Sequence, residues 1–264
     1  MNSPVTIVED NLSVAWAKAF LEVMYVEEIA PLVVVIRFLD NGAPPEVPAI
    51  REAVDYALEA DGKGLSCHTV ANTIFPSMWN PEAERQKLYD RYCRILPRVR
   101  RYRGNRYGLY FERLIAFGHD GNGQGGVNQL EHIIQTWNGG NHRRTALQAS
   151  LFDPRRDHTH QRQRGFPCLQ QVAFAPDGVQ GLAVTGFYAT QHIFERAYGN
   201  YLGLYRLGRF MAHEMGLRLI QVTCIATPAV RDRPKSVLER LSERVRAALR
   251  QVETPAVAGG DARG

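Results

Sequence analysis

Cys168 has the residue type and the surroundings of a nucleophile. It follows Pro167 and opens a strand-like run, and the preceding loop is rich in arginine, at positions Arg155, Arg156, Arg162 and Arg164. Nearby guanidinium groups favour a thiolate over a thiol, and the thiolate is the reactive form. The alternative is an inert buried cysteine. Cys224, inside an apolar run, and Cys67, without basic neighbours, are weaker candidates.

Two further patterns could indicate ligand sites. His158 and His160 have the spacing of two metal ligands, and Cys67 adjoins His68, but no third ligand follows at a recognisable interval. Structural zinc needs four ligands, so no metal is predicted. The glycine-rich segment 118–126 lacks the lysine and the strand–helix context of a phosphate-binding loop, and it is interpreted as an ordinary connection.

The positive charge is unevenly distributed. The net charge is +5, and residues 94–106 contain six arginines and no acidic residue. Arginine pairs bidentately with phosphate and carboxylate, so this segment could bind an anion. A solvated basic face, or a surface that attracts RNA or DNA, are the alternatives.

The composition is that of a globular protein. Of 264 residues, 45% are apolar and 22% are charged, which excludes a disordered chain, a fibre and a small disulfide scaffold. The longest apolar candidate, residues 29–38, is too short to span a bilayer and contains Pro31 and Arg37. The start of the chain, with Glu9 and Asp10, does not look like a secretory signal, and four separated cysteines suggest a reducing compartment. We therefore expect a soluble cytoplasmic protein.

Periodicity and turn residues predict alternating helices and strands. Strands are expected at residues 31–38, 146–152, 169–175, 182–188 and 219–225, with a Pro-Asp-Gly hairpin turn at 176–178. Helices are expected at residues 49–60, 81–95 (ended by Pro97), 127–137, 202–215 and 234–252. The interpretation is one α+β domain over residues 1–253, followed by a disordered tail at 254–264.

Several motifs follow one another in a specific order between residues 107 and 225. They are Tyr107-Gly108 followed by Phe111-Glu112-Arg113, then Asn128-Gln129-Leu130, Asn141-His142-Arg143-Arg144, and Pro167-Cys168. This order resembles thymidylate synthase and the related pyrimidine nucleotide hydroxymethylases. The resemblance covers a little under half of the chain. It implies an α+β fold with a mixed β-sheet packed with helices, in which one sheet face forms a homodimer interface.

The resemblance also implies a reaction. The thiolate of Cys168 would add to C6 of a pyrimidine nucleotide, and C5 would then accept a one-carbon unit from a reduced folate, 5,10-methylenetetrahydrofolate, as a methyl or hydroxymethyl group. Arg143 and Arg144 would reach across the dimer to the phosphate in the partner's site, with Arg164 near the same anion.

Further residues receive roles from the same resemblance. Tyr107 would belong to the proton-transfer network, and Glu52 would be the general acid near the start of an early helix. Asn200 would contact the pyrimidine, and Tyr188 would lie beside the substrate. The implied partner is a small-molecule nucleotide, with neither nucleic acid nor membrane.

The chain departs from the family pattern at several contacts. Tyr188-Ala189-Thr190-Gln191 lacks the family's phosphate-binding arginine, and Ile193 replaces the aspartate that contacts folate. The Asp-x-His-x-Tyr that grips the sugar is missing at residues 226–229. A non-catalytic nucleotide-binding or interaction protein on the same fold therefore stays open as the alternative, as does an RNA- or DNA-binding protein that uses residues 94–106.

Overall fold

The computed structural model describes residues 3–39, 44–119, 126–160, 166–177 and 180–253. Its strands are β1 (Val5–Glu9), β2 (Glu28–Ile29), β3 (Leu32–Arg37), β4 (Gln148–Ser150), β5 (Leu169–Pro176), β6 (Gly181–Tyr188), β7 (Gln191–His192), β8 (Arg218–Ala226) and β9 (Ala229–Val230). Its α-helices are α1 (Leu12–Tyr25), α2 (Pro48–Ala60), α3 (Cys67–Ile74), α4 (Arg85–Arg100), α5 (Tyr110–Ile115), α6 (Gln129–Asn138), α7 (Pro154–Asp157), α8 (Tyr198–Glu214) and α9 (Lys235–Glu253). Short 3-10 turns, η1 (Arg103–Asn105) and η2 (Arg144–Ala146), and a π-helix, η3 (Ile193–Ala197), complete the order.

The main sheet is mixed and has the strand order β1-β3-β8-β6-β5-β4. The β1–β3 and β6–β8 pairs are parallel, and the remaining pairs are antiparallel. A small second sheet, β2-β9-β7, links the end of α1 to the entry into η3. The fold is therefore α+β, with a mixed sheet packed against helices, as the sequence predicts.

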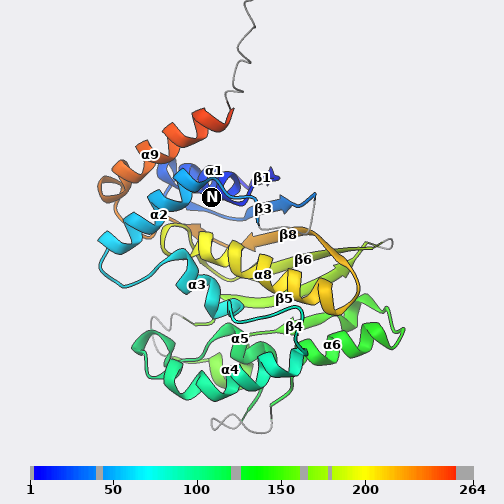
Figure 1. Cartoon of the computed structure of the whole chain (residues 1–264). Helices are drawn as coiled ribbons and strands as arrows, with labels where there is room; N and C mark the ends of the chain where they lie inside the picture. Colours follow the sequence, from blue (N-terminus) through cyan, green and yellow to red (C-terminus); the bar gives the residue numbers. More distant parts are fainter. Residues whose placement is uncertain (1–2, 40–43, 120–125, 161–165, 178–179, 254–264) are drawn as a thin grey trace, which may run out of the picture.

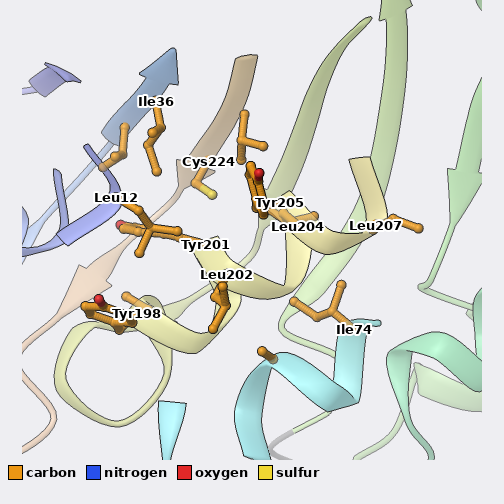
Figure 2. Packing of buried hydrophobic residues seen from close by; sticks show 14 of the residues in the cluster. Leu12, Ile36, Ile74, Tyr198, Tyr201, Leu202, Leu204, Tyr205, Leu207 and Cys224 are labelled. Atoms are coloured by element: carbon orange, nitrogen blue, oxygen red, sulfur yellow. The ribbon is translucent and has the colours of Figure 1, made fainter. Parts of the chain in front are cut away.

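One face of the main sheet carries the core. Helix α8 crosses this face (Figure 1), and its leucines lie against the strands. Figure 2 shows Cys224 on β8 near Tyr201 and Leu204 of α8, with Ile74 of α3 on the other side of the helix. Val184 on β6 and Val222 on β8 are fully buried on the same face. Burial of such side chains, at about 25 cal/mol per Å², is the main stabilising term for this layer.

The opposite face of the sheet is only partly covered. Alternate residues of each strand point to opposite faces, and the residues of this second face are half-buried or exposed, apart from Thr223, which is 8% exposed. Strand pairing aligns them in two rows: Val8, Val35, Thr223, Thr185, Ala173 and Gln148 in one, and Thr6, Val33, Ile225, Phe187, Gln171 and Ser150 in the other. Val8 and Phe187 are 47% and 40% exposed. We call these twelve residues the open sheet face.

Helices α3 and α8 are in unusually close contact. A Cβ atom on Gly199 would lie 2.4 Å from Cβ of Val70, and one on Gly203 would lie 2.9 Å from Cβ of Ile74. Only glycine permits this approach, because any side chain at these positions would have to displace the backbone of α3. The contact fixes α3 against the central helix, which matters because α3 forms part of the site described below.

The structure confirms most predicted elements and corrects their limits. The hairpin strands, the strand at 219–225 and the helices at 49–60, 202–215 and 234–252 are present with shifts of a few residues. The predicted end of a helix before Pro97 is wrong, because α4 continues through Pro97 to Arg100. The predicted strand at 146–152 shrinks to β4, preceded by η2. The tail at 254–264 lies outside the described residues.

The described helices include none that is both long and apolar enough to cross a membrane.

Candidate functional site

Cys168 is half-buried, directly before β5, and the phenol of Tyr110 holds its backbone. The N–H groups of Cys168 and Leu169 donate to Oη of Tyr110, over 3.2 and 3.4 Å. The carbonyl of Cys168 accepts a hydrogen bond from the N–H of Ala189, over 2.9 Å, across the β5–β6 pair. The position of the thiol is therefore set by α5 on one side and by the end of β6 on the other.

A stack of side chains fixes Tyr110 in turn. Its ring centre lies 5.1 Å from that of Phe166, with an angle of 31° between the two planes. The guanidinium of Arg113 lies 4.7 Å from the centre of the Phe166 ring. Arg113 is buried and ion-paired with buried Asp157, with Nη2 to Oδ1 at 2.8 Å. Gly108 has φ +117° and no Cβ, and a Cβ atom built on it would lie 3.2 Å from the ring of Phe166. The absence of that atom allows Phe166 to pack here. Truncating either partner of the buried pair would leave an uncompensated charge, so this stack is rigid.

The electrostatics around Cys168 work in two directions. Burial raises the pKa of the thiol, while the positive charge of Arg196 and the hydrogen bond with Tyr110 act to lower it. Burial also raises the pKa of Tyr188, and the neighbouring Tyr110 and Cys168 add to that effect. The net pKa of Cys168 is above its ordinary value, so the resting group at neutral pH is a thiol whose deprotonation depends on Arg196.

A cavity of about 1000 Å³ is lined by Phe166 and Arg196. Phe166 lies two residues before Cys168 in the chain, and the charge of Arg196 acts on the Cys168 thiol, which is not itself a lining residue. The cations that line it are Lys63, Arg103, Arg106 and Arg196, the aromatic residues are Tyr92, Tyr102, Tyr107 and Phe166, and the amides are Asn72 and Asn105. None of the described lining residues is acidic. A cavity of this size and composition suits an anionic ligand with a flat ring.

Helix α3 presents the polar wall of the cavity. Thr69, Asn72 and Thr73 line it. Oδ1 of Asn72 accepts from the N–H of Ser77, over 3.1 Å, and from Nη1 of Arg206, over 3.0 Å. Because the oxygen has these two donors, the amide Nδ2 of Asn72 is the group positioned to donate to a ligand carbonyl.

The arginine-rich segment does not form one basic surface. Arg100 turns inward to the buried carboxylate of Glu112, which also contacts His119. Arg103 and Arg106 line the cavity, and Arg106 stacks on Tyr107 at 4.5 Å. The remaining arginines of residues 94–106 are exposed. The segment thus divides between a structural ion pair, the cavity and solvent.

An ion-pair network holds η3, the element that carries Arg196. Glu195 pairs with Lys63 and with Arg233, and Arg233 also pairs with Asp61 over 2.7 Å. His192, Glu195 and Asp232 place ligand atoms within 4.8 Å of one another, an arrangement that could hold a metal ion. However, Glu195 is already compensated by two cations, and Asp232 accepts the N–H groups of Phe194 and Glu195. Ion pairing thus accounts for the charge of Glu195, and backbone N–H donors account for the carboxylate of Asp232.

Of the predicted site residues, Tyr107 lines the cavity, whereas Cys168 and Tyr188 do not. Tyr188 neighbours Cys168 instead, since it pairs with Leu169 across the sheet. Oη of Tyr188 is buried and has no hydrogen-bond partner within the described part of the chain. Glu52 lies elsewhere: it is exposed on α2, at a separate shallow pocket with Tyr56 and Arg244. Helices α3 and α4 both line the cavity, and neither contributes a carboxylate to the described lining.

The predicted phosphate and base contacts are more dispersed. Arg143 and Arg144 are exposed at η2 and make no ion pair among the residues that the structure describes. Asn200 is buried within α8 and does not line the cavity. Arg164 falls outside the described residues, together with Arg162.

The residues present do not fit the pterin contact that a reduced folate would need. The ring edge of a pterin presents N–H donors that a carboxylate would accept. None of the described residues that line the cavity is acidic, and Ile193, which the resemblance places at that carboxylate's position, is fully buried. We therefore derive no chemical step through folate.

No protein-family model matches the chain, and no curated protein matches it either. The site is consequently defined by its geometry. Sequence reasoning missed Tyr110, Arg196 and Asn72, which lie 58, 28 and 96 residues from Cys168 in the chain. The motif Tyr107-Gly108 pointed to the correct segment, but nothing in a single sequence indicates that Tyr110, three residues later, reaches the backbone of Cys168.

Proposed function

We propose that this chain is a thymidylate-synthase-like transferase that acts at C5 of a pyrimidine nucleotide through a covalent adduct with Cys168. One observation carries the proposal: Phe166, two residues before Cys168, and Arg196, whose charge acts on the thiol, line a large cavity whose described lining is cationic and aromatic and contains no acidic residue. Such a lining attracts a phosphate and a flat ring together. The one-carbon donor is left outside the proposal because Ile193 does not suit a pterin.

The ring chemistry follows from these residues. The Cys168 thiol loses its proton to water, and the thiolate, stabilised by Arg196, adds to C6 of the pyrimidine. The C5–C6 electron pair moves toward C4 and its oxygen, which leaves C5 nucleophilic. The Asn72 amide is available to donate to a ring carbonyl. If C5 takes a proton from water, loss of the original hydrogen and expulsion of the thiolate regenerate both the ring and Cys168.

Exchange of the C5 hydrogen with solvent tests this chemistry without folate. The purified protein is incubated with UMP, dUMP, CMP and dCMP deuterated at C5, and loss of deuterium is followed by mass spectrometry. We expect exchange with at least one nucleotide, and its loss in Cys168→Ala, while nucleotide binding is retained. Absence of exchange with all four, or equal exchange in Cys168→Ala, would contradict the proposal.

A non-catalytic nucleotide-binding protein is the second candidate. Two observations favour it: burial raises the pKa of Cys168, and no carboxylate lines the described cavity. In this case nucleotides stabilise the fold without exchange at C5. A ligand at 100 times its Kd adds about 2.7 kcal/mol to the free energy of unfolding, and Cys168→Ala would show the same stabilisation as the unaltered chain.

We extend the first proposal to a homodimer. The open sheet face presents apolar side chains, including Val33, Ile225 and Phe187, that helices α1 and α8 do not cover. A second copy packed on this face would bury them, and exposed apolar patches of this kind often mark protein interfaces. Arg143 and Arg144, which are exposed on the described surface, would then be available to a partner's cavity.

A further inference from the structure

The hydrogen-bonding capacity of Tyr110 is nearly exhausted by the backbone before Cys168 Sγ is considered. A phenol has one proton and accepts through the lone pairs of its oxygen. The N–H groups of Cys168 and Leu169 both donate to that oxygen. The phenol proton must therefore be directed to another acceptor. Sγ of Cys168 belongs to a residue whose own N–H is bonded to this oxygen, and Tyr110 acts to lower the pKa of that thiol.

We propose that Tyr110 is a positioning residue that directs its phenol proton at Sγ of Cys168. Its oxygen at the same time accepts the two backbone N–H groups that flank the Cα of Cys168. The three hydrogen bonds tie the sulfur to α5. Accepting two N–H groups polarises the phenol and makes its O–H a better donor. The O–H···S bond is stronger to a thiolate than to a thiol, because one partner is then charged. Tyr110 thus favours the reactive form.

The packing around Tyr110 supports this role. The ring is held on Phe166, which is held by Arg113 and its buried partner Asp157. Burial raises the pKa of Tyr110, so the phenol keeps its proton at neutral pH and acts as a donor. A donor fixed in this way does not need to reorganise when the charge on sulfur changes.

Within the described part of the chain, the ionisable groups that act on Cys168 or neighbour it come from three elements. Tyr110 approaches from α5, Arg196 from η3 and Tyr188 from β6. Arg196 contributes charge, and Tyr188 is an uncharged neighbour on the buried side. Tyr110 alone holds the backbone of Cys168 as well, so its removal should change both the position and the acidity of the thiol.

The test is the pH dependence of alkylation at Cys168. The full chain is labelled with iodoacetamide. Labelling at Cys168 is then separated from labelling at the exposed Cys93 by peptide mass spectrometry. Tyr110→Phe keeps the ring stack but removes the phenol oxygen, and with it the proposed O–H···S bond and the two bonds to the backbone N–H groups. We expect the labelling profile of Cys168 to move to higher pH, and the rate near pH 7 to fall about three- to tenfold, since a weaker acid is also a somewhat better nucleophile.

Tyr89→Phe is the matched control, because Tyr89 is another buried tyrosine that does not line the cavity. Its labelling profile should match that of the unaltered chain. Should Tyr110→Phe not fold, 3-fluorotyrosine introduced at position 110 preserves the shape and strengthens the donor. The Cys168 profile should then move to lower pH. An unchanged profile in the folded Tyr110 variant would overturn the proposal.

Only the consequence for turnover rests on the proposed function. If C5 exchange is absent but the alkylation profile shifts in Tyr110→Phe, the proposed function fails and the role of Tyr110 stands. If exchange depends on Cys168 and the profile does not shift, the role of Tyr110 fails alone.

Discussion

The described cations around Cys168 are not those that the sequence suggests. Arg155 is exposed and lies beside Asp153, Arg162 and Arg164 fall outside the described residues, and among the described cations Arg196 is the one that acts on the sulfur. Burial outweighs that cation and raises the pKa of the thiol. The reactive state is therefore populated by deprotonation, and activity that depends on it should increase with pH above neutral.

Substitution of Arg196 tests this balance. In Arg196→Gln the thiolate loses its nearest positive charge, so the pKa of Cys168 should rise further and alkylation near pH 7 should slow about two- to tenfold. Arg155→Gln is the control: sequence reasoning expects an effect from it, and the structure expects none. Equal rates in the unaltered chain and in Arg196→Gln would contradict the electrostatic role of Arg196.

At the residue level the sequence pointed to Cys168 as a candidate nucleophile but not to the groups that surround it. Cys168 and Tyr107 could be found because each belongs to a short local motif. Tyr110, Arg196 and Asn72 could not, because their contacts depend on how α5, η3 and α3 meet in space. The match of Glu52 to a general acid relied on one loosely matching helix, and α2 places that side chain in solvent.

Helix packing determines where the polar wall of the cavity stands. Gly199→Ala would bring a methyl group to 2.4 Å from Val70 and 2.7 Å from the carbonyl of Cys67. Alanine favours a helix over glycine by up to about 1 kcal/mol, but overpacking costs about 1–3 kcal/mol. We expect a net loss of stability, measured as a melting temperature several degrees lower, and weaker nucleotide binding. Gly203→Ala, with a 2.9 Å approach, should have a smaller effect; the reverse order would contradict this packing account.

The ion-pair network around η3 should make stability sensitive to acid. Although burial opposes it, hydrogen bonds from His192 and Lys63 and the charge of Arg233 hold the pKa of Glu195 well below its usual range. Arg233 likewise lowers the pKa of Asp61. A lowered carboxylate pKa contributes stability that is complete above the unfolded pKa, about 4, and is lost as the pH falls through the folded pKa.

Arg233→Met removes the cation shared by both carboxylates. At pH 7 we expect the free energy of unfolding to fall by about 1–3 kcal/mol, because these groups are only partly exposed. Urea unfolding between pH 3 and pH 7 should show a shallower acid dependence in the variant, with the two curves converging at low pH. Parallel curves would show that the pairs contribute nothing to the acid dependence of stability.

At the element level, patterned segments were predictable and fully buried ones were not. The hairpin follows from strand-like runs around Pro176-Asp177, and α9 from its charged and apolar faces. Helix α1 was missed because it is buried on nearly every side, from Leu12 to Phe20, and so shows no apolar stripe. Pro97 misled the prediction because a proline near the C-terminal end of a helix disrupts few hydrogen bonds.

The open sheet face makes a prediction for the whole molecule. If two copies associate through it, Phe187→Asp would place two carboxylates in an apolar interface and produce monomers, visible by sedimentation at micromolar concentration. Val237→Asp is the control, since Val237 is 60% exposed on α9, away from the sheet. If the unaltered chain is monomeric, or if Phe187→Asp still sediments as a dimer, this interface is excluded.

The glycine contacts between α3 and α8 have a consequence for how ligand binding could be detected. Since α3 contributes the cavity wall and touches the central helix backbone to backbone, a molecule that restrains α3 must also damp the motions of α8. Amide hydrogen exchange within the middle of the protein would therefore slow upon binding, well away from any atom the ligand contacts. A screen of metabolites could use that slowing as its signal before any reaction has been assigned.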